Sequence, residues 1–392
     1  MNKDIIKKSD KAITATYTRP SIVIEKGQGC TLWDTEGRAY TDFLAGIAVC
    51  NLGHAHPEIA KALCNQAHTL FHVSNLYYTI PQTELASWLT EHSFADRVFF
   101  CNSGAEANEA AIKIARRYFY EKGEFHRYRI VTAEKSFHGR TMATLSATGQ
   151  DKIKKGFSPI LEGFDYVPFN NIEALKNAME PSVCAVMLEP VQGEGGVILP
   201  DPEYLETVRR MCDETGTLLI FDEIQTGIGR TGKLFAYEHF NIEPDIMTLA
   251  KALGNGLPIG AMLTREYIAQ AFTPGAHAST FGGTPVITAA ALKTLEVLTR
   301  ENIIDYCRET GVYFKEKLME LKSRHESVVD VRGIGLLIGM ELNMEGAQIV
   351  LECMKKGFLI NCIQGNILRF APPLIIKKED IDALINCLDE IL

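Results

Sequence analysis

The sequence predicts an α/β protein with a large domain built on a mostly parallel sheet and a smaller α+β domain. Two observations favour this class. Between about residues 58 and 300, strands and helices alternate, and strands such as Val183–Glu189 and Thr217–Asp222 are almost wholly apolar, as in a parallel sheet covered by helices on both faces. Beyond about residue 301, short strands lie between helices, which is typical of a separate α+β domain.

We expect three regions along the chain. Residues 1–57 form an N-terminal arm that is also part of the small domain, residues 58–300 form the large domain, and residues 301–392 form the C-terminal small domain. The turn at 35–38 predicts a hairpin in the arm. The expected strands are, in order, Ser21–Glu25, Thr31–Asp34, Ala39–Phe43, Arg97–Cys101, Arg129–Ala133, Val183–Glu189, Thr217–Asp222, Ile246–Ala250, Ile259–Thr264, Val328–Arg332, Gly335–Leu342, Phe358–Asn361 and Ile367–Phe370. The expected helices are Ala105–Lys122, Pro202–Thr215, Pro285–Arg300, Ile303–Lys322, Glu345–Lys356 and a last one from Glu379.

The composition excludes several classes of protein. Of the 392 residues, 46% are hydrophobic and 23% are charged, the balance of a globular protein rather than a disordered or fibrous one. The net charge is −9 and basic residues form no run, which argues against a nucleic-acid partner. No apolar run approaches the ~18 residues that span a bilayer, and Met1–Asp10 lacks the apolar segment of a secretory signal. We therefore expect a cytoplasmic protein with no membrane partner.

The cysteines and histidines do not predict a metal site. The ten cysteines are scattered and form no Cys-x-x-Cys pair, so we expect reduced thiols in an intracellular protein. His54 and His56 are two residues apart but have no cysteine or carboxylate at ligand spacing beside them. We therefore expect no metal.

A strand, a turn of small residues and a helix meet at Asn102-Ser103-Gly104-Ala105. The strand Arg97–Cys101 ends there, and Ser103 and Gly104 lie at the start of the helix. Free backbone N–H groups and the helix dipole at such a point bind an anion, most often a phosphate. The residues alone leave an ordinary helix cap open as the alternative.

Two ionisable residues end apolar strands of the same sheet. Asp222 ends the strand Thr217–Asp222, where open α/β sheets place their ligands. A carboxylate there can hold a cation, orient a histidine or pair with a protonated ring nitrogen. Lys251 follows the strand Ile246–Ala250 and precedes a glycine-rich loop, and a desolvated lysine can form a Schiff base. A solvated carboxylate and a surface lysine are the alternatives that spacing leaves open.

The segment Gly227-Ile228-Gly229-Arg230-Thr231-Gly232 matches the dinucleotide-binding pattern G-x-G-x-x-G. In that motif the first glycine follows the strand directly and the last opens an apolar helix. Here two carboxylates, Asp222 and Glu223, follow the strand and would repel a pyrophosphate, and the residues after Gly232 form no long apolar pattern. We therefore interpret the match as a chance one and disfavour a nicotinamide-dependent dehydrogenase.

Together, a phosphate cradle, a carboxylate and a lysine at strand ends of one sheet are the three anchors of pyridoxal phosphate. From Tyr17 to Pro373, the chain resembles the class III pyridoxal-phosphate-dependent aminotransferases, and among them the enzymes that act on acetylated ornithine. This resemblance implies the aspartate aminotransferase-like fold, fold type I. It rests on NSGAEANEAA (102–111), SFHGRT (136–141), EPVQGEGG (189–196), FDEIQTGIGRTG (221–232), AKALGNGLPIGA (250–261) and STFGGTP (279–285).

The resemblance implies roles around the cofactor, pyridoxal 5'-phosphate. Lys251 is expected to hold it covalently and to move a proton between substrate and cofactor. Asp222 is expected to pair with the pyridine nitrogen, which makes the ring an electron sink. The other expected contacts are Gln225 near the phenolic oxygen, Phe137 on the ring face, and Ser103, Gly104 and Ala105 at the phosphate.

The resemblance also implies how substrates and a second subunit are bound. Thr280 is expected to reach the phosphate of the neighbouring subunit's cofactor, which implies a homodimer with shared active sites. The expected substrate contacts are Arg140 and Arg369, each on a carboxylate, Glu194 as a movable cover of Arg369, and Ser279 and Tyr17 near the substrate. Arginine suits this task because its fork binds a carboxylate through two hydrogen bonds.

The function implied is transfer of the amino group of N2-acetyl-L-ornithine to 2-oxoglutarate in arginine biosynthesis, with succinyl-diaminopimelate as a second expected donor. The alternatives are other ω-amine donors, such as ornithine or 4-aminobutyrate, and a silent binding protein, which would have lost Lys251, Asp222 or Arg140; all three are present. Ala278 and Thr284 depart from the glycine and asparagine usual at these places, next to the expected phosphate and substrate contacts.

Overall fold

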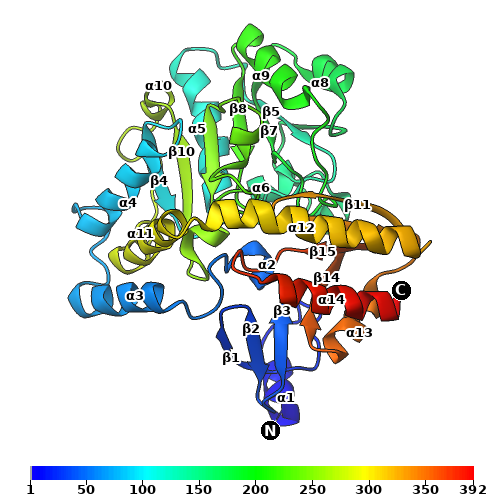
Figure 1. Cartoon of the computed structure of the whole chain (residues 1–392). Coiled ribbons are helices and arrows are strands. Elements are labelled where there is room, and N and C mark those ends of the chain that lie inside the picture. Colours follow the sequence, from blue (N-terminus) through cyan, green and yellow to red (C-terminus); the bar gives the residue numbers. More distant parts are fainter. Residues whose placement is uncertain (1) are drawn as a thin grey trace.

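The centre of the molecule is a seven-stranded sheet, seen in the upper part of Figure 1. A computed structural model describes residues 2–392, so Met1, the first residue of the expected arm, lies outside the described residues. The order across the sheet is β4-β10-β9-β8-β7-β5-β6. The strands are β4 (Arg97–Cys101), β5 (Arg129–Ala133), β6 (Phe164–Val167), β7 (Val183–Leu188), β8 (Leu218–Asp222), β9 (Ile246–Leu249) and β10 (Gly260–Thr264).

Helices cover both faces of this sheet. Leu219 and Phe221 of β8 belong to one hydrophobic cluster, whereas Ile220 between them belongs to another. The first cluster includes residues of α4 (Ile80–Glu91), α9 (Tyr204–Thr215) and α11 (Pro285–Arg300), and the second includes residues of α5 (Gly104–Glu121). The side chains of a strand point alternately to the two faces, so a strand between two apolar layers needs apolar residues at every position.

One strand of the sheet differs from the expected pattern. The sequence predicts Ile259–Thr264 as a further strand of a mostly parallel sheet, but β10 pairs antiparallel with both β4 and β9. The other pairs, from β9 to β6, are parallel. Because β10 is buried at every position, like its parallel-paired neighbour β9, its composition carries no information about its direction.

There are two smaller sheets, and the first lies in the lower part of Figure 1, where the first and last parts of the chain meet. The sheet β1-β2-β3-β13 joins three N-terminal strands to a C-terminal one, and Phe358 of β13 pairs parallel with Thr41 of β3. The second sheet has the order β11-β12-β15-β14. The strands are β1 (Ile24–Gln28), β2 (Thr31–Asp34), β3 (Ala39–Asp42), β11 (Val328–Ile334), β12 (Leu337–Leu342), β13 (Phe358–Leu359), β14 (Asn361–Ile363) and β15 (Ile367–Phe370).

The C-terminal helices α12 (Ile303–Arg324), α13 (Ala347–Lys355) and α14 (Lys378–Ile391) pack among these sheets. Their positions agree with the expected helices to within two or three residues. Several elements were not expected from the sequence, and the N-terminal arm in particular begins with a helix. The unexpected helices are α1 (Asn2–Ala12), α2 (Ala45–Ala48), α3 (Pro57–Thr69), α4, α6 (Met142–Ala147), α7 (Asp151–Lys154), α8 (Ile172–Ala178) and α10 (Glu266–Ala269). Among residues 2–392, no helix has both the length and the apolar character needed to cross a membrane.

Candidate active site

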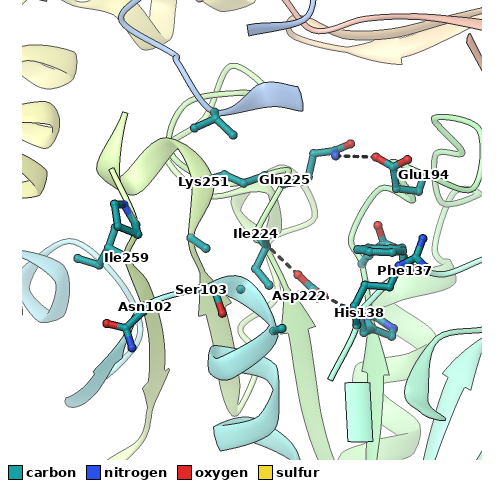
Figure 2. Close-up of a pocket in the computed structure, with 18 of the residues that line it drawn as sticks. Asn102, Ser103, Phe137, His138, Glu194, Asp222, Ile224, Gln225, Lys251 and Ile259 are labelled. Carbon is teal, nitrogen blue, oxygen red and sulfur yellow. Dashed lines mark hydrogen bonds and ion pairs between the residues drawn. The ribbon is translucent and has the colours of Figure 1, made fainter. Parts of the chain in front are cut away.

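The strands β5, β7, β8 and β9 point their carboxyl ends toward one cavity of about 470 Å³. The segments that follow these strands line it, together with the start of α5 (Figure 2). This is the edge where doubly wound sheets bind ligands. The lining residues include Ser103, Gly104, Ala105, Phe137, Arg140, Glu194, Asp222, Gln225 and Lys251, so nine of the residues expected at the site from the sequence lie together.

The start of α5 is built as an anion site. The Ser103 hydroxyl accepts a hydrogen bond from the Glu106 N–H at 3.2 Å, and the Glu106 carboxylate accepts one from the Asn102 N–H at 2.8 Å. The first-turn N–H groups of Gly104 and Ala105 have no helical acceptor and lie at the cavity. The cap and the anion site are therefore compatible, since the capping residue leaves these two amides to a ligand.

A glycine of the neighbouring strand permits this arrangement. A Cβ atom built on Gly260 of β10 would lie 2.2 Å from the Ser103 carbonyl oxygen, far inside contact distance. Only glycine lets β10 approach the beginning of α5 so closely. The position of the anion site at residues 103–105 thus depends on the close packing of β10 beneath it.

Asp222 is a buried carboxylate held by three partners. Its Oδ2 accepts a hydrogen bond from Asn108 Nδ2 at 2.7 Å and lies 2.8 Å from His138 Nδ1, and its Oδ1 accepts one from the Ile224 N–H at 3.1 Å. The side chain is only 3% exposed, which excludes the solvated-carboxylate alternative. Figure 2 shows His138 and Asp222 side by side at the strand ends.

His138 and Asn108 were not among the site residues predicted from the sequence. Both lie within the segments 102–111 and 136–141 quoted above, but nothing in their spacing predicts that they meet. Asn108 also accepts a hydrogen bond from Thr248 Oγ1 of β9 at 2.7 Å. Asp222 is thus fixed from α5, from β9 through Asn108, and from the loop after β5, which only the three-dimensional fold brings together.

Lys251 comes two residues after the last residue of β9, at the start of the 3-10 helix Lys251–Gly254, and has a positive φ of 43°, which is rare for a residue other than glycine. Its side chain lies in the cavity (Figure 2), so the surface-lysine alternative is excluded. Desolvation lowers the pKa of the Lys251 ammonium to about 8, because a charged form is disfavoured away from water. A substantial share of this amine is therefore neutral near physiological pH.

Arg369 and Glu194 form an ion pair at one side of the cavity. Arg369, on β15, is 1% exposed, and its Nη1 lies 2.5 Å from Glu194 Oε1. Gln225 lies beside the pair, with its Oε1 3.3 Å from Arg369 Nη1 and its Nε2 3.3 Å from Glu194 Oε1. Burial acts against ionisation of Glu194, but Arg369 and Lys251 lower the pKa of its carboxyl group. Glu194 is therefore a carboxylate opposite a buried cation.

Phe137, Arg140 and Glu189 complete the wall after β5 and β7. The Arg140 guanidinium lies 5.6 Å from the Phe137 ring centroid, and its side chain is exposed toward the opening. The buried Glu189 accepts hydrogen bonds from the N–H groups of Phe137 and Gly193, both at 3.1 Å. Burial raises the pKa of the Glu189 carboxyl group to about 7. Glu189 thus joins the loop of Phe137 to the loop of Glu194, a role the sequence did not suggest.

Besides Arg369, which contacts the lining residues Glu194 and Gln225, three of the expected residues do not line this cavity. Ser279 and Thr280 line a second hollow with Asn75 and Leu76, although Ser279 Oγ lies 3.3 Å from Asn102 Nδ2 at the edge of the first. Tyr17 is 74% exposed, in the segment that follows α1. Within one chain, these three residues are not part of the cavity.

The segment that matches a dinucleotide-binding pattern is not a cofactor loop. Residues 227–232 lie in turns after β8 and lead to a 3-10 helix, Ala236–His239, instead of an apolar crossover helix. Arg230 is fully buried there, away from the cavity. The structure thus agrees with the rejection of a nicotinamide site. His54, the other misleading signal, pairs with Asp42 at 2.7 Å.

The donor set of the cavity fits pyridoxal phosphate. Two amides without a helical acceptor at the start of α5 can hold a phosphate, a buried carboxylate can pair with a protonated ring nitrogen, and a lysine of lowered pKa can bind an aldehyde. The aromatic ring of Phe137 and the apolar side chain of Ile224 provide walls for a planar ring. Fold and site therefore define a pyridoxal-phosphate-dependent transferase of the aspartate aminotransferase type, fold type I.

Comparison with known proteins identifies the family. The sequence model of the aminotransferase class-III family matches residues 12–392, and the chain belongs to this family. The acetylornithine aminotransferase of Caldanaerobacter subterraneus subsp. tengcongensis is 52% identical over 383 residues, which cover 97% of each chain. That of Methanocaldococcus jannaschii is 52% identical over 96% of this chain and 94% of its own. This protein is thus an aminotransferase, and its cofactor is pyridoxal phosphate.

Solved structures agree with this assignment. The ornithine aminotransferase of Toxoplasma gondii ME49 superposes with a TM-score of 0.96 at 34% identity and covers 100% of this chain and 94% of its own. The acetylornithine aminotransferase of Elizabethkingia anophelis gives a TM-score of 0.89 at 32% identity, over 99% and 98% of the two chains. Enzymes that use different amino-group donors share this fold, so the fold alone does not identify the donor.

Proposed function

We propose that this aminotransferase transfers the amino group of N2-acetyl-L-ornithine to 2-oxoglutarate, which gives N-acetyl-L-glutamate 5-semialdehyde and L-glutamate in arginine biosynthesis. Succinyl-diaminopimelate is a second proposed donor. The observation that carries the proposal is the Arg369–Glu194 ion pair, because Glu194 and the neighbouring Gln225 line the same cavity as Lys251 and Asp222. The names of relatives at 52% identity over almost the whole chain support the same donor.

Lys251 and Asp222 are the proposed catalytic residues. When bound, pyridoxal phosphate supplies an electron sink for the bond that breaks at the amine-bearing carbon. Lys251 Nζ would hold the cofactor through its aldehyde, and the same amine would take and return the proton at that carbon. Asp222 keeps the ring nitrogen protonated, and His138 and Asn108 fix its carboxylate. The amides at the start of α5 would hold the cofactor's phosphate.

Arg140 and Arg369 are the proposed carboxylate-binding residues. Arg140 stands at the opening, where it can bind the α-carboxylate of acetylornithine. The rest of that donor is uncharged apart from its reacting amine, so Arg369 stays covered by Glu194. For 2-oxoglutarate, Glu194 moves away and Arg369 binds the second carboxylate. An ion pair with a movable partner spares the enzyme a buried, unpaired cation in either half of the reaction.

We propose that the enzyme is a homodimer with shared active sites. Segments 70–80 and 279–284 lie side by side, since Asn75 Nδ2 donates to the carbonyl oxygens of Ser279 and Gly282 at 3.0 and 2.9 Å. These segments expose large apolar side chains, which in other proteins mark an interaction surface. The exposed side chains are Leu70, Phe71, Leu76, Tyr77, Tyr78, Ile80 and Phe281. A second copy docked there brings Ser279 and Thr280 to its partner's cavity, which accounts for their absence from their own.

The visible spectrum of the yellow holoenzyme tests the donor. N2-acetyl-L-ornithine, ornithine, 4-aminobutyrate and succinyl-diaminopimelate are added in separate cuvettes without a keto acid, and the decay of the cofactor band is followed. Acetylornithine is expected to convert the band fastest, and 2-oxoglutarate is expected to restore it. Faster conversion by ornithine or 4-aminobutyrate would overturn the donor but leave the enzyme class intact.

A further inference from the structure

A buried cation lies outside the active site, in the loop after β8. The Arg230 side chain is 0% exposed. Its hydrogen bonds within residues 2–392 go to neutral oxygens: Nη1 donates to the carbonyls of Leu336 at 3.0 Å and Pro372 at 2.6 Å, and Nη2 to Asn51 Oδ1 at 2.5 Å. Burial lowers the pKa of the guanidinium to about 10, so Arg230 remains charged at neutral pH. Such a cation is costly to bury, and an apolar side chain would fill the space without this cost.

The partners of Arg230 belong to segments that also carry the active site. Pro372 comes three residues after Arg369, at the end of β15. Asn51 comes two residues after Val49, which lines the cavity. Arg230 itself follows Gln225 in the loop after β8. One planar group therefore ties together the main segments that place Arg369, Val49 and Gln225.

The backbone around Arg230 is tightly joined as well. Asn51 Nδ2 donates to the Ile228 carbonyl at 2.7 Å, and the Leu374 N–H donates to the Asn51 carbonyl at 2.7 Å. The Leu336 N–H donates to the carbonyl of Arg230 at 3.1 Å. The guanidinium is thus the centre of a network that crosses from the large sheet to the small one, and a shift of β15 relative to β8 would break several of its hydrogen bonds together.

We propose that Arg230 is a positioning residue that sets the affinity for the second carboxylate of the keto acid. By holding Pro372 and Asn51, it fixes Arg369 in line with Gln225 and Glu194, without touching the substrate. Displacements of about 1 Å are enough to weaken a bidentate contact strongly. This inference rests on the proposed role of Arg369 in binding 2-oxoglutarate.

The variant Arg230→Lys tests the proposal in the holoenzyme. Lysine keeps the charge but lacks the rigid fork that reaches separate acceptors. The probe is glutarate, a five-carbon dicarboxylate without the reacting keto group, and its binding is followed by calorimetry. We expect its Kd to rise about tenfold or more and KM for 2-oxoglutarate to rise with it, while kcat of the half-reaction with the amine donor changes less than about threefold.

Arg308→Lys is the matched control, because Arg308 contacts Gly232 in the same region but is half exposed and pairs with Asp305 at the surface. It is expected to leave Kd and both half-reactions unchanged. Asn51→Ser, which shortens the side chain that accepts from Nη2, is expected to change Kd in the same direction by a smaller factor. If Arg230→Lys does not fold, Asn51→Ser replaces it as the test of the proposal.

A double-mutant cycle shows whether Arg230 acts through Arg369. In an Arg369→Gln background, Arg230→Lys is expected to change the Kd of glutarate by less than about twofold, since the contact it positions is gone. Equal factors in both backgrounds would overturn the inference, as would equal losses in both half-reactions. If the wild type neither binds glutarate nor uses 2-oxoglutarate, the proposed co-substrate fails and the inference with it. If the wild type does both and Arg230→Lys matches it, the inference fails alone.

Discussion

The lowered pKa of Lys251 makes loading of the cofactor dependent on pH. Only the neutral amine attacks an aldehyde, and the pKa of about 8 lies well below the ordinary 10.5. In cofactor-free protein, we expect the rate of covalent loading to rise about tenfold per pH unit up to about pH 8 and then to level off. Stopped-flow absorbance measures it, with Lys317→Ala, at a surface ion pair, as the control. A rate that is flat between pH 6 and 8 would contradict the shift.

The same shift has a consequence for stability. The folded lysine releases its proton near pH 8, whereas the unfolded one keeps it to about 10.5. Because the unfolded state binds more protons between these values, the free energy of unfolding of the cofactor-free protein receives from Lys251 a contribution that increases with pH across this window.

Asp222 is expected to matter through its charge. Asp222→Asn keeps the size of the side chain but no longer favours a protonated ring nitrogen, so kcat should fall about 10²-fold or more while the protein remains folded. Steady-state rates at saturating substrates measure this effect. Asp245→Asn is the comparison: Asp245 also accepts a backbone N–H, from Leu219, and pairs with Arg209, but it lies outside the cavity. Asp245→Asn should mainly lower thermal stability, whereas Asp222→Asn should mainly lower kcat. The opposite result would argue against the assignment of Asp222.

For single residues, the sequence predicted those members of the site whose position along the chain also fixes where they lie in the fold. Asp222 and Lys251 end apolar strands, so their arrival at one edge of the sheet follows from strand direction. His138 and Asn108 could not be inferred in this way, because their contacts with Asp222 depend on how a loop and a helix pack over the strand.

Among the elements, the contact between β10 and α5 controls the phosphate site. In Gly260→Ala, the added Cβ would meet the Ser103 carbonyl, which is backbone and cannot move without shifting the cap of α5. We expect a loss of stability of about 1–3 kcal/mol and weaker binding of pyridoxal phosphate. Thermal melts and titration with the cofactor measure the two effects.

Gly339→Ala on β12 is the control for this substitution. A Cβ there would meet the side chains of Val197 and Ile367 at 3.2–3.3 Å, so the neighbours can adjust and the cofactor site is not involved. Equal cofactor affinity in Gly260→Ala and the wild type would contradict the proposed dependence.

Elements with strong composition signals were predictable, such as the apolar β7 and β8 and the helix α11. The antiparallel direction of β10 was not, since burial on both faces requires the same residues in either direction. Helix α1 was also missed, and none of its residues is buried in the structure.

For the whole molecule, the apolar surface formed by segments 70–80 and 279–284 predicts a dimer whose activity depends on its assembly. In the double variant Leu76→Glu/Ile80→Glu, both changed side chains are about four-fifths exposed in the single chain, so the fold should persist while like charges meet across the interface. We expect a monomer in sedimentation analysis and a loss of activity of about tenfold or more, because Thr280 no longer reaches the partner's cavity. Val312→Glu, on the exposed side of α12, should change neither. A variant that is monomeric and fully active would overturn the shared site.

The order of strands in the N-terminal sheet has a consequence for synthesis on the ribosome. β3 leaves the ribosome early, but its neighbour β13 is among the last strands to be made. Through most of translation, the edge of β3 therefore has unpaired backbone groups, which invite pairing with other chains. The large sheet can assemble while the chain still grows, but the small one cannot be completed until the C-terminal residues emerge. A nascent chain that stalls anywhere between β3 and Phe358 would thus present an open strand edge, so the need for chaperone protection lasts through most of elongation.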